Sequence, residues 1–137
     1  FSTTVANSWS KVVTDPKKLI LGTPWYGYRW PATSTAPGAA TLAKGTALSY
    51  RYDVAGKYTK IWDDKGKVPY AAYTKDGATW QIWYDDAESL GLKFDAAKDH
   101  EFGGVGCWRL PWGDDAVWEK VKAYKDGFVL PPLPSSP

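Results

Sequence analysis

Residues 18–30 read KLILGTPWYGYRW, and this stretch is the strongest indication of the fold class in the sequence. A continuous apolar run over residues 18–22, rather than an alternating one, is typical of a strand that is buried on both faces in a parallel sheet. Aromatic side chains follow this run from Trp25 onward. The stretch therefore predicts a buried parallel strand whose C-terminal end is crowded by aromatic rings.

An amphipathic helix is predicted further along the chain, directly after residue 84. Either Asp85 or Asp86 can cap its N-terminus, because a carboxylate accepts hydrogen bonds from the free amides of the first helical turn. The glycine pair at 103–104 is expected to end the helix through a left-handed cap. The apolar face of this helix consists of Leu90, Phe94 and Ala97.

A second strand and a last helix complete this region. The strand is expected over residues 104–110, and the helix begins at the aspartate pair 114–115 and ends at Gly127. The apolar face of this last helix consists of Val117, Val121 and Tyr124. Strand, helix, strand, helix is the order of an α/β protein with a parallel sheet. Two such strands do not close a sheet, so the sequence calls for strand partners that it does not contain.

Residues 32–84 differ in character from the segments on either side. Residues 32–47 are rich in Ala, Thr, Gly and Pro and are expected to form a loop. The dipeptide Asp76-Gly77 joins two aromatic-rich runs, 68–74 and 79–84, and predicts a tight β-hairpin. This region is therefore expected to be a small β or α+β insertion.

Composition and charge exclude several classes of function. Seventeen Lys and Arg against fifteen Asp and Glu give a net charge of +2, and the basic residues are scattered, so no nucleic-acid track is expected. No apolar run approaches the ~20 residues of a membrane span. His100 is the only histidine and Cys107 the only cysteine, so no metal-ligand spacing occurs and no metal or cofactor is expected.

Nine tryptophans and nine tyrosines are the unusual feature of the composition. Flat amphipathic rings suit a surface that stacks on sugars, and they also suit an aromatic core. One group, Trp25, Tyr26, Tyr28 and Trp30, follows the first strand, and Trp108, Arg109 and Trp112 follow the second. The carboxyl ends of parallel strands lie at one edge of a sheet, so these residues are candidates for one sugar-binding site. Core packing is the open alternative for the tryptophans of the first group.

The strand ends carry no candidate catalytic acid, although enzymatic sugar cleavage generally uses paired carboxylates. The three glutamates, Glu88, Glu101 and Glu119, fall in or beside expected helices. The aspartate pairs are explained by helix capping and turn formation. No residue of this chain is therefore assigned a catalytic role.

Three blocks of the sequence, in this order, resemble the family 18 glycoside hydrolases, the chitinase family. Residues 18–28 resemble the seventh barrel strand, residues 83–90 the end of the family's insertion, and residues 103–108 the eighth strand. In the family, the tryptophan that corresponds to Trp108 forms the floor of the central sugar subsite. Residues 24–28, together with residues 68–70, are similar to the di-N-acetylchitobiase branch in particular.

The resemblance implies an α/β fold, the C-terminal portion of a TIM (β/α)8 barrel with strands 7 and 8, their flanking helices and a small α+β insertion. The chain is accordingly expected to have four segments. Residues 1–31 contain the end of a helix, at 5–13, and the seventh strand, and residues 32–84 form the insertion with its hairpin. Residues 85–127 contain a helix, the eighth strand and the last helix, and residues 128–137 form a proline-rich tail.

The resemblance also implies a chitinase- or chitobiase-like glycosidase that cleaves β-1,4-linked N-acetylglucosamine glycans by a retaining, substrate-assisted mechanism. The family's acidic signature on the fourth strand is absent here. The catalytic acid is therefore expected on another segment or on a partner chain that completes the barrel, and the chain alone is not expected to be active. The alternative is a non-catalytic carbohydrate-binding or structural relative. The implied compartment is extracellular or lysosomal/vacuolar.

Overall fold

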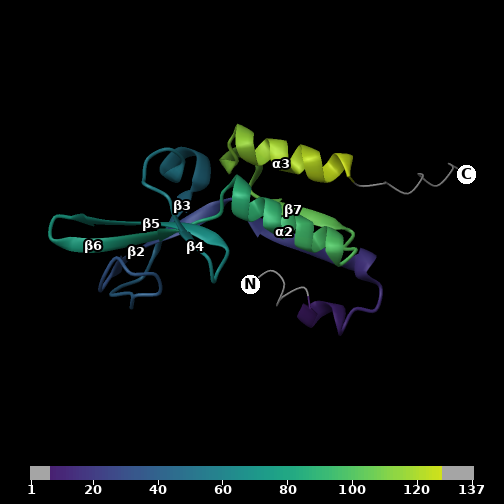
Figure 1. The fold of residues 1–137 in the computed structure, drawn as a ribbon, viewed down its shortest axis with the longest axis horizontal. Helices are drawn as coiled ribbons and strands as arrows, with labels where there is room; N and C mark the ends of the chain where they lie inside the picture. The colour runs from purple at the N-terminus through teal and green to yellow at the C-terminus, as the bar shows by residue number, and fades with distance from the viewer. Residues whose placement is uncertain (1–6, 128–137) are drawn as a thin grey trace, which may run out of the picture.

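The computed structural model describes residues 7–127 of the chain. These residues contain two β-sheets of different kinds together with the helices that pack on them. The smaller sheet is a parallel pair, β1 (Ile20–Pro24) and β7 (Gly104–Trp108). Helices α2 (Ala87–Asp99) and α3 (Asp115–Asp126) lie together along one side of this pair, and the larger sheet extends beyond its end (Figure 1). The parallel pairing predicted for the two strands is confirmed.

The larger sheet is antiparallel and has five strands. In spatial order these are β3 (Thr46–Ser49), β2 (Tyr26–Ala32), β6 (Ala78–Trp83), β5 (Val68–Lys75) and β4 (Ile61–Asp63). The predicted hairpin is confirmed, because β5 and β6 pair across a turn in which Asp76 and Gly77 both have positive φ, 51° and 74°. The predicted start of the insertion at residue 32 is too late, since the sheet already includes β2.

The insertion starts earlier because the chain changes its pairing partner directly after β1. β1 pairs with β7, whereas β2 pairs with β3 and β6. Gly27 lets β2 approach β6 so closely that a Cβ atom at this position would lie 2.6 Å from the carbonyl oxygen of Trp83. Tyr26 and Tyr28 therefore belong to a strand of the large sheet and not to a loop after β1.

Helix α2 begins as predicted and ends differently. The Asp86 side chain accepts hydrogen bonds from the amides of Glu88 and Ser89, and Ser89 Oγ accepts one from the Asp86 amide, which completes a capping box. The left-handed residue after the helix is Glu101, with φ 53°, and not a glycine. Gly103 is needed for space instead, because a Cβ atom there would lie 2.0 Å from the carbonyl oxygen of Lys17.

The remaining elements are short. Residues 7–10 are helical, and the first two residues of the helix predicted at 5–13 lie outside the described part of the chain. Three single turns follow: η1 (Pro16–Lys18), η2 (Tyr50–Val54) and η3 (Leu110–Trp112). The capping of α3 by Asp114 is confirmed by its hydrogen bond from the Val117 amide, at 2.9 Å. The predicted tail, 128–137, lies outside the described residues.

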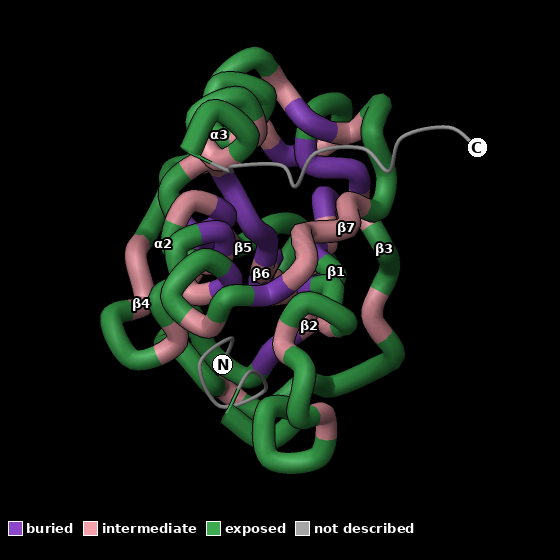
Figure 2. Tube along the Cα trace, turned by 90° about the vertical axis from the view of Figure 1, so that its right-hand side faces the viewer, coloured by how far each residue is buried: buried purple, intermediate pink, exposed green. Residues whose placement is uncertain are grey.

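The hydrophobic core lies between the helices and the two sheets (Figure 2). Both predicted helix faces contribute to it, with Leu90, Phe94 and Ala97 of α2 buried and Val117 of α3 fully buried. Burial of these apolar faces is the main force that fixes the helices against the strands.

The other side of the parallel pair is open. Within residues 7–127, β1 and β7 pair only with each other, so each strand has an outer edge without a ladder partner. Ile20 projects away from the helices and is 60% exposed, which is unusual for an isoleucine in a parallel strand. No helix in the described part is long and apolar enough to cross a membrane.

Candidate functional site

Trp25 and Trp108 lie at the ends of neighbouring strands, and their side chains occupy opposite environments. Pro24 pairs with Trp108, and the amide of Trp25 donates a 2.7 Å hydrogen bond to the Trp108 carbonyl. The Trp25 side chain is fully buried, whereas that of Trp108 is 68% exposed. Of the two tryptophans, only Trp108 can offer a ring face to a ligand.

Trp25 is therefore a core residue, and its predicted role as a sugar contact is wrong. Its ring meets Trp118 edge to face at 5.0 Å, and it lies so close to Gly113 that a Cβ atom there would be 2.6 Å away. It belongs to the same buried cluster as Val117. The ring holds the start of α3 against the end of β1.

Trp108 borders an open hollow of about 420 Å³ at the C-terminal parts of β1 and β7. The hollow is lined by Gly22, Thr23, Pro24, Tyr26, Gly106, Cys107 and Trp108. Two glycines in this set leave room above the strands, so a flat ring can approach the backbone beside Trp108. This is the geometry expected of a sugar subsite with an aromatic wall.

Tyr26 connects this hollow to the large sheet. It is half-buried, and its ring meets the edges of Trp112 at 6.3 Å and Tyr28 at 5.9 Å. Tyr28 is 40% exposed and stacks on Trp30 at 5.5 Å. Tyr26, Tyr28 and Trp30 are thus linked by ring contacts, and Tyr26 lines the same hollow as Trp108.

Arg109 directly follows Trp108 and is exposed. The Trp108–Arg109 peptide bond is cis, and the guanidinium lies over the Trp112 ring at 4.5 Å. A cation held against an aromatic face keeps its N–H donors in a fixed plane, where they can reach hydroxyl or carbonyl oxygens.

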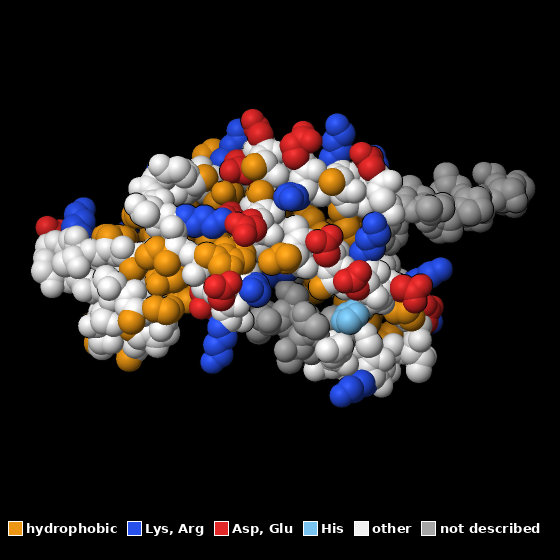
Figure 3. Space-filling view, viewed as in Figure 1, with side chains coloured by type: hydrophobic (Ala, Val, Ile, Leu, Met, Phe, Trp, Pro, Cys, Tyr) orange, Lys and Arg blue, Asp and Glu red, His pale blue; other side chains and the backbone are white. Residues whose placement is uncertain are grey.

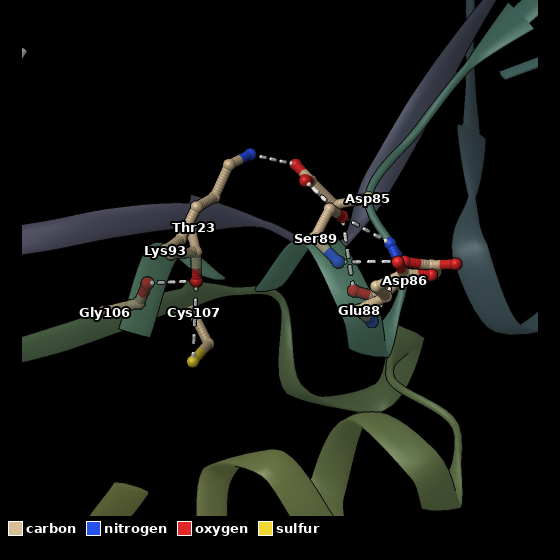
Figure 4. Close-up of polar contacts among 8 residues, drawn as sticks. All are labelled: Thr23, Asp85, Asp86, Glu88, Ser89, Lys93, Gly106 and Cys107. Carbon is tan, nitrogen blue, oxygen red and sulfur yellow. Dashed lines mark hydrogen bonds and ion pairs between the residues drawn. The ribbon is translucent and has the colours of Figure 1, made fainter. Parts of the chain in front are cut away.

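Cys107 lines the hollow without the features of a reactive thiol. The Thr23 hydroxyl donates to the Gly106 carbonyl at 2.9 Å and lies 3.9 Å from the Cys107 sulfur (Figure 4). Burial raises the pKa of the Cys107 thiol, which keeps it protonated at neutral pH.

The carboxylates at the start of α2 serve the fold. Asp85 is buried and accepts a hydrogen bond from Ser89 Oγ at 2.7 Å, while its second oxygen pairs with Lys93 at 2.5 Å (Figure 4). Asp86 caps the helix and pairs with Lys60 at 2.7 Å. These contacts account for both aspartates as structural groups.

The same region fixes the large sheet to the helices. Tyr50 stacks on Tyr84 at 5.9 Å, and its amide donates to the carbonyl of Trp25 at 3.2 Å. Burial, together with the negative charges of Asp114 and Asp86, raises the pKa of Tyr50 above its ordinary range.

No described glutamate lies at the end of β1 or β7. Glu88 lies in the first turn of α2 and pairs with Lys60 at 2.6 Å, Glu101 lies in the turn after that helix, and Glu119 is exposed on α3. Across residues 7–127, no group of three or more His, Cys, Asp or Glu side chains could hold a metal ion. The lining of the hollow at Trp108 contains no carboxylic acid that could protonate a leaving group.

Two aromatic residues near the site were not predicted to belong to it. Trp83 of β6 stacks on Tyr70 of β5 at 4.6 Å, with 13° between the ring planes, and Trp83 is the direct neighbour of Tyr28 across the sheet. The alternation of side chains within the predicted hairpin shows that Trp83 and Tyr70 can share a face of the sheet. It does not show which face of the sheet lies next to β1.

The described residues form a mixed α/β fold with an aromatic hollow at the C-terminal ends of two parallel strands. The family model for glycosyl hydrolases family 18 matches residues 1–112. The chain belongs to this family.

Individual relatives agree with this assignment. Human di-N-acetylchitobiase is 30% identical over 149 residues, covering 85% of this chain and 38% of that protein. Chitinase A1 of Niallia circulans is 34% identical over 134 residues, covering 85% of this chain and 19% of that protein. The chain thus spans well under half the length of either relative.

A solved structure gives the same picture. A family 18 chitinase mutant from Cycas revoluta, crystallised in complex with (GlcNAc)4, superposes with a TM-score of 0.67 at 25% identity, covering 88% of this chain and 36% of that one. The similar solved structures include chitinases of family 18, a family with a TIM-barrel fold.

Proposed function

We propose that this chain forms the aromatic wall of the substrate cleft in a chitinase- or chitobiase-like glycosidase acting on β-1,4-linked N-acetylglucosamine glycans. The single observation that carries the proposal is the orientation of Trp108. Its ring is exposed beside a glycine-floored hollow at the C-terminal end of a parallel strand, where barrel enzymes bind their substrates.

The roles of the other residues follow from their positions. Trp108 stacks on the apolar face of a pyranose ring, Tyr26 and Tyr28 extend the wall, and Arg109 donates hydrogen bonds to sugar oxygens. The names of the relatives indicate the class of glycan. Di-N-acetylchitobiase and chitinase are named after glycans built from N-acetylglucosamine, and the Cycas protein was crystallised in complex with (GlcNAc)4.

The catalytic acid belongs to another part of the barrel. Strands β1 and β7 take the place of the seventh and eighth strands, and their two open edges fit further strands from another segment or a partner chain. In this arrangement an external glutamate protonates the glycosidic oxygen, and the substrate's own acetamido group attacks the anomeric carbon. An extracellular or lysosomal/vacuolar location is proposed with this function.

Binding of N-acetylglucosamine oligomers to the native-length protein tests the proposal. By titration calorimetry, Trp108→Ala is expected to weaken binding about tenfold, about 1.4 kcal/mol, because an exposed stacking face is lost. Trp9→Ala is the matched control, since Trp9 is 55% exposed but precedes the start of β1, at the opposite end of the strand. Equal affinities for the wild type and Trp108→Ala would overturn the proposed role of Trp108.

The same native-length protein tests hydrolysis. Mass spectrometry should find a companion segment of roughly 200 residues, judged from the usual size of a TIM barrel. Release of shorter oligomers from chitohexaose is expected when that segment is present. Binding without any release would instead favour a non-catalytic carbohydrate-binding protein.

A further inference from the structure

Arg29 lies on the face of the five-stranded sheet that is turned away from the hollow at Trp108. Side chains alternate along β2, so Tyr26, which lines the hollow, and Tyr28 lie on one face and Arg29 on the other. Arg29 pairs with Ile82, which is fully buried in the same core cluster as Tyr50 of η2. Arg29 is therefore not part of the site at Trp108.

The charge of Arg29 has no counter-charge among the described residues. Arg29 and Lys93 are the basic side chains of residues 7–127 that are not exposed, and Lys93 pairs with the buried Asp85. The other ion pairs within these residues involve Lys60 and Lys67, and none includes Arg29. A cation that is partly removed from water is normally paired with an anion. Arg29 thus has room for an anionic partner.

The guanidinium of Arg29 is held in a fixed position. It lies over the ring of Trp80 on the neighbouring strand β6, 5.2 Å from the ring centroid. Its Nε atom is enclosed and has no hydrogen-bond partner among the described residues. The side chain as a whole is half-buried, so its terminal Nη groups are the donors that a ligand can reach.

Two tyrosine side chains adjoin Arg29 on the same face. Tyr73 pairs with Trp80 across the sheet, and its ring stacks on that of Tyr58 at 5.2 Å. Both tyrosines are half-buried. Burial, and then Tyr73, raises the pKa of Tyr58, whereas the nearby charge of Arg29 acts in the opposite direction. The Tyr58 hydroxyl is therefore close to Arg29 and keeps its proton at neutral pH, as a hydrogen-bond donor must.

The segment that contains Arg29 and Tyr58 is basic. Residues 29–58 contain a single acidic residue, Asp53, whose carboxylate already accepts hydrogen bonds from the amide and the hydroxyl of Ser49, both at 2.8 Å. The basic residues of the segment are Arg29, Lys44, Arg51 and Lys57. Acidic side chains gather instead over α2 and α3 (Figure 3). This distribution of charge favours the approach of an anion to the large sheet.

We propose that Arg29, together with the hydroxyls of Tyr58 and Tyr73, binds an oxyanion, a phosphate or carboxylate group. The two Nη groups of a guanidinium match two oxygens of such a group, and the phenols can donate to the remaining lone pairs. The oxyanion supplies the counter-charge that Arg29 lacks. This inference does not rest on the proposed function, because the site lies on the opposite face from Tyr26 and the hollow.

The chain has three arginines, Arg29, Arg51 and Arg109, so their side-chain Nε–Hε signals in a ¹⁵N-labelled native-length protein give a direct test. Inorganic phosphate and, separately, acetate would be added at an ionic strength held constant with chloride. The Arg29 signal is expected to shift and to saturate with a Kd on the order of 1–10 mM. Arg51 is the internal control, because it also lies over an aromatic ring, that of Tyr52 at 5.7 Å, but is exposed. Its signal should not saturate.

Thermal unfolding of variants gives a second readout. Phosphate at about tenfold its Kd should raise the unfolding midpoint of the wild type and of Arg51→Gln by about 2–5 °C relative to chloride, because the ion binds only the folded state. Arg29→Gln should abolish this rise. Tyr73→Phe keeps the stacked ring and removes one donor, so it is expected to weaken phosphate binding about 3- to 10-fold.

The outcomes decide the inference as follows. Saturation with phosphate alone assigns the site to phosphate groups, and saturation with acetate alone assigns it to carboxylates. If neither ion saturates the Arg29 signal, or if Arg51 saturates equally, the site is overturned. An equal midpoint rise in Arg29→Gln would also overturn it. Should Arg29→Gln fail to fold, Tyr73→Phe decides in its place, and an unchanged Kd for that variant would refute the role of the phenols.

Discussion

The contrasting environments of Trp25 and Trp108 give a direct test of which tryptophan serves the fold and which serves binding. Replacement of Trp25 by Ala empties a site that is fully buried and removes the edge-to-face contact with Trp118. Core tryptophans replaced by Ala typically cost about 3–5 kcal/mol of unfolding free energy. Trp108→Ala removes a ring that is 68% exposed, and its cost is expected to stay within about 0.5 kcal/mol.

Trp25→Phe separates the contributions of ring packing and hydrogen bonding to the unfolding free energy at the same position. The indole N–H of Trp25 has no hydrogen-bond partner among the described residues, so a phenyl ring loses packing volume but no hydrogen bond. We expect Trp25→Phe to cost less than Trp25→Ala, because a ring still fills most of the space beside Gly113 and Val117.

The assay is urea unfolding of the native-length protein, followed by far-ultraviolet circular dichroism, with oligomer binding measured on each folded variant. Trp25→Ala should move the midpoint to lower urea with an unchanged slope. Trp108→Ala should keep the midpoint and lose affinity. A loss below about 1 kcal/mol for Trp25→Ala, or a selective loss of binding by a stable Trp25→Ala protein, would refute the assignment of Trp25 to the core.

Two further predictions concern backbone space and alkaline stability. Gly103→Ala should lower the unfolding free energy by about 1–3 kcal/mol, because its Cβ atom would lie 2.0 Å from the Lys17 carbonyl oxygen. Urea unfolding measures this cost, and Gly106→Ala, at a site with more room, is the control. A cost for Gly103→Ala no greater than that for Gly106→Ala would contradict the prediction. Burial, and then the charge of Asp114, raises the pKa of Tyr50 in the folded state, so the unfolded state loses the phenol proton at a lower pH. The stability that this group contributes is therefore fully present below pH about 10 and is lost as the pH rises above that value. Tyr50→Phe should flatten this alkaline loss in unfolding curves recorded from pH 8 to 11, and an unchanged slope would contradict the assignment.

The local features of the fold were predictable because neighbouring residues alone produce them. An Asp-Gly pair that accepts positive φ turns the β5–β6 hairpin, and aspartates before apolar-periodic segments cap α2 and α3. The parallel pairing of β1 with β7 was also predicted, from the order strand, helix, strand, helix and from the resemblance of the two strands to the seventh and eighth strands of a barrel.

The end of α2 shows where local reasoning fails. A glycine pair suggests a left-handed cap, but Glu101 takes the positive φ and Gly103 is required by the carbonyl of Lys17. That carbonyl is distant in sequence, so no local pattern reveals the contact.

The site follows the same division. Sequence reasoning predicted that aromatic residues follow both parallel strands and that Trp108 is a candidate for a sugar contact. The burial of Trp25, the inclusion of β2 in the large sheet and the pairing of Trp83 with Tyr28 became known only from the folded structure. The physical reason is that caps and turns depend on hydrogen bonds between near neighbours, whereas the side on which a ring is buried depends on packing between elements far apart in the chain.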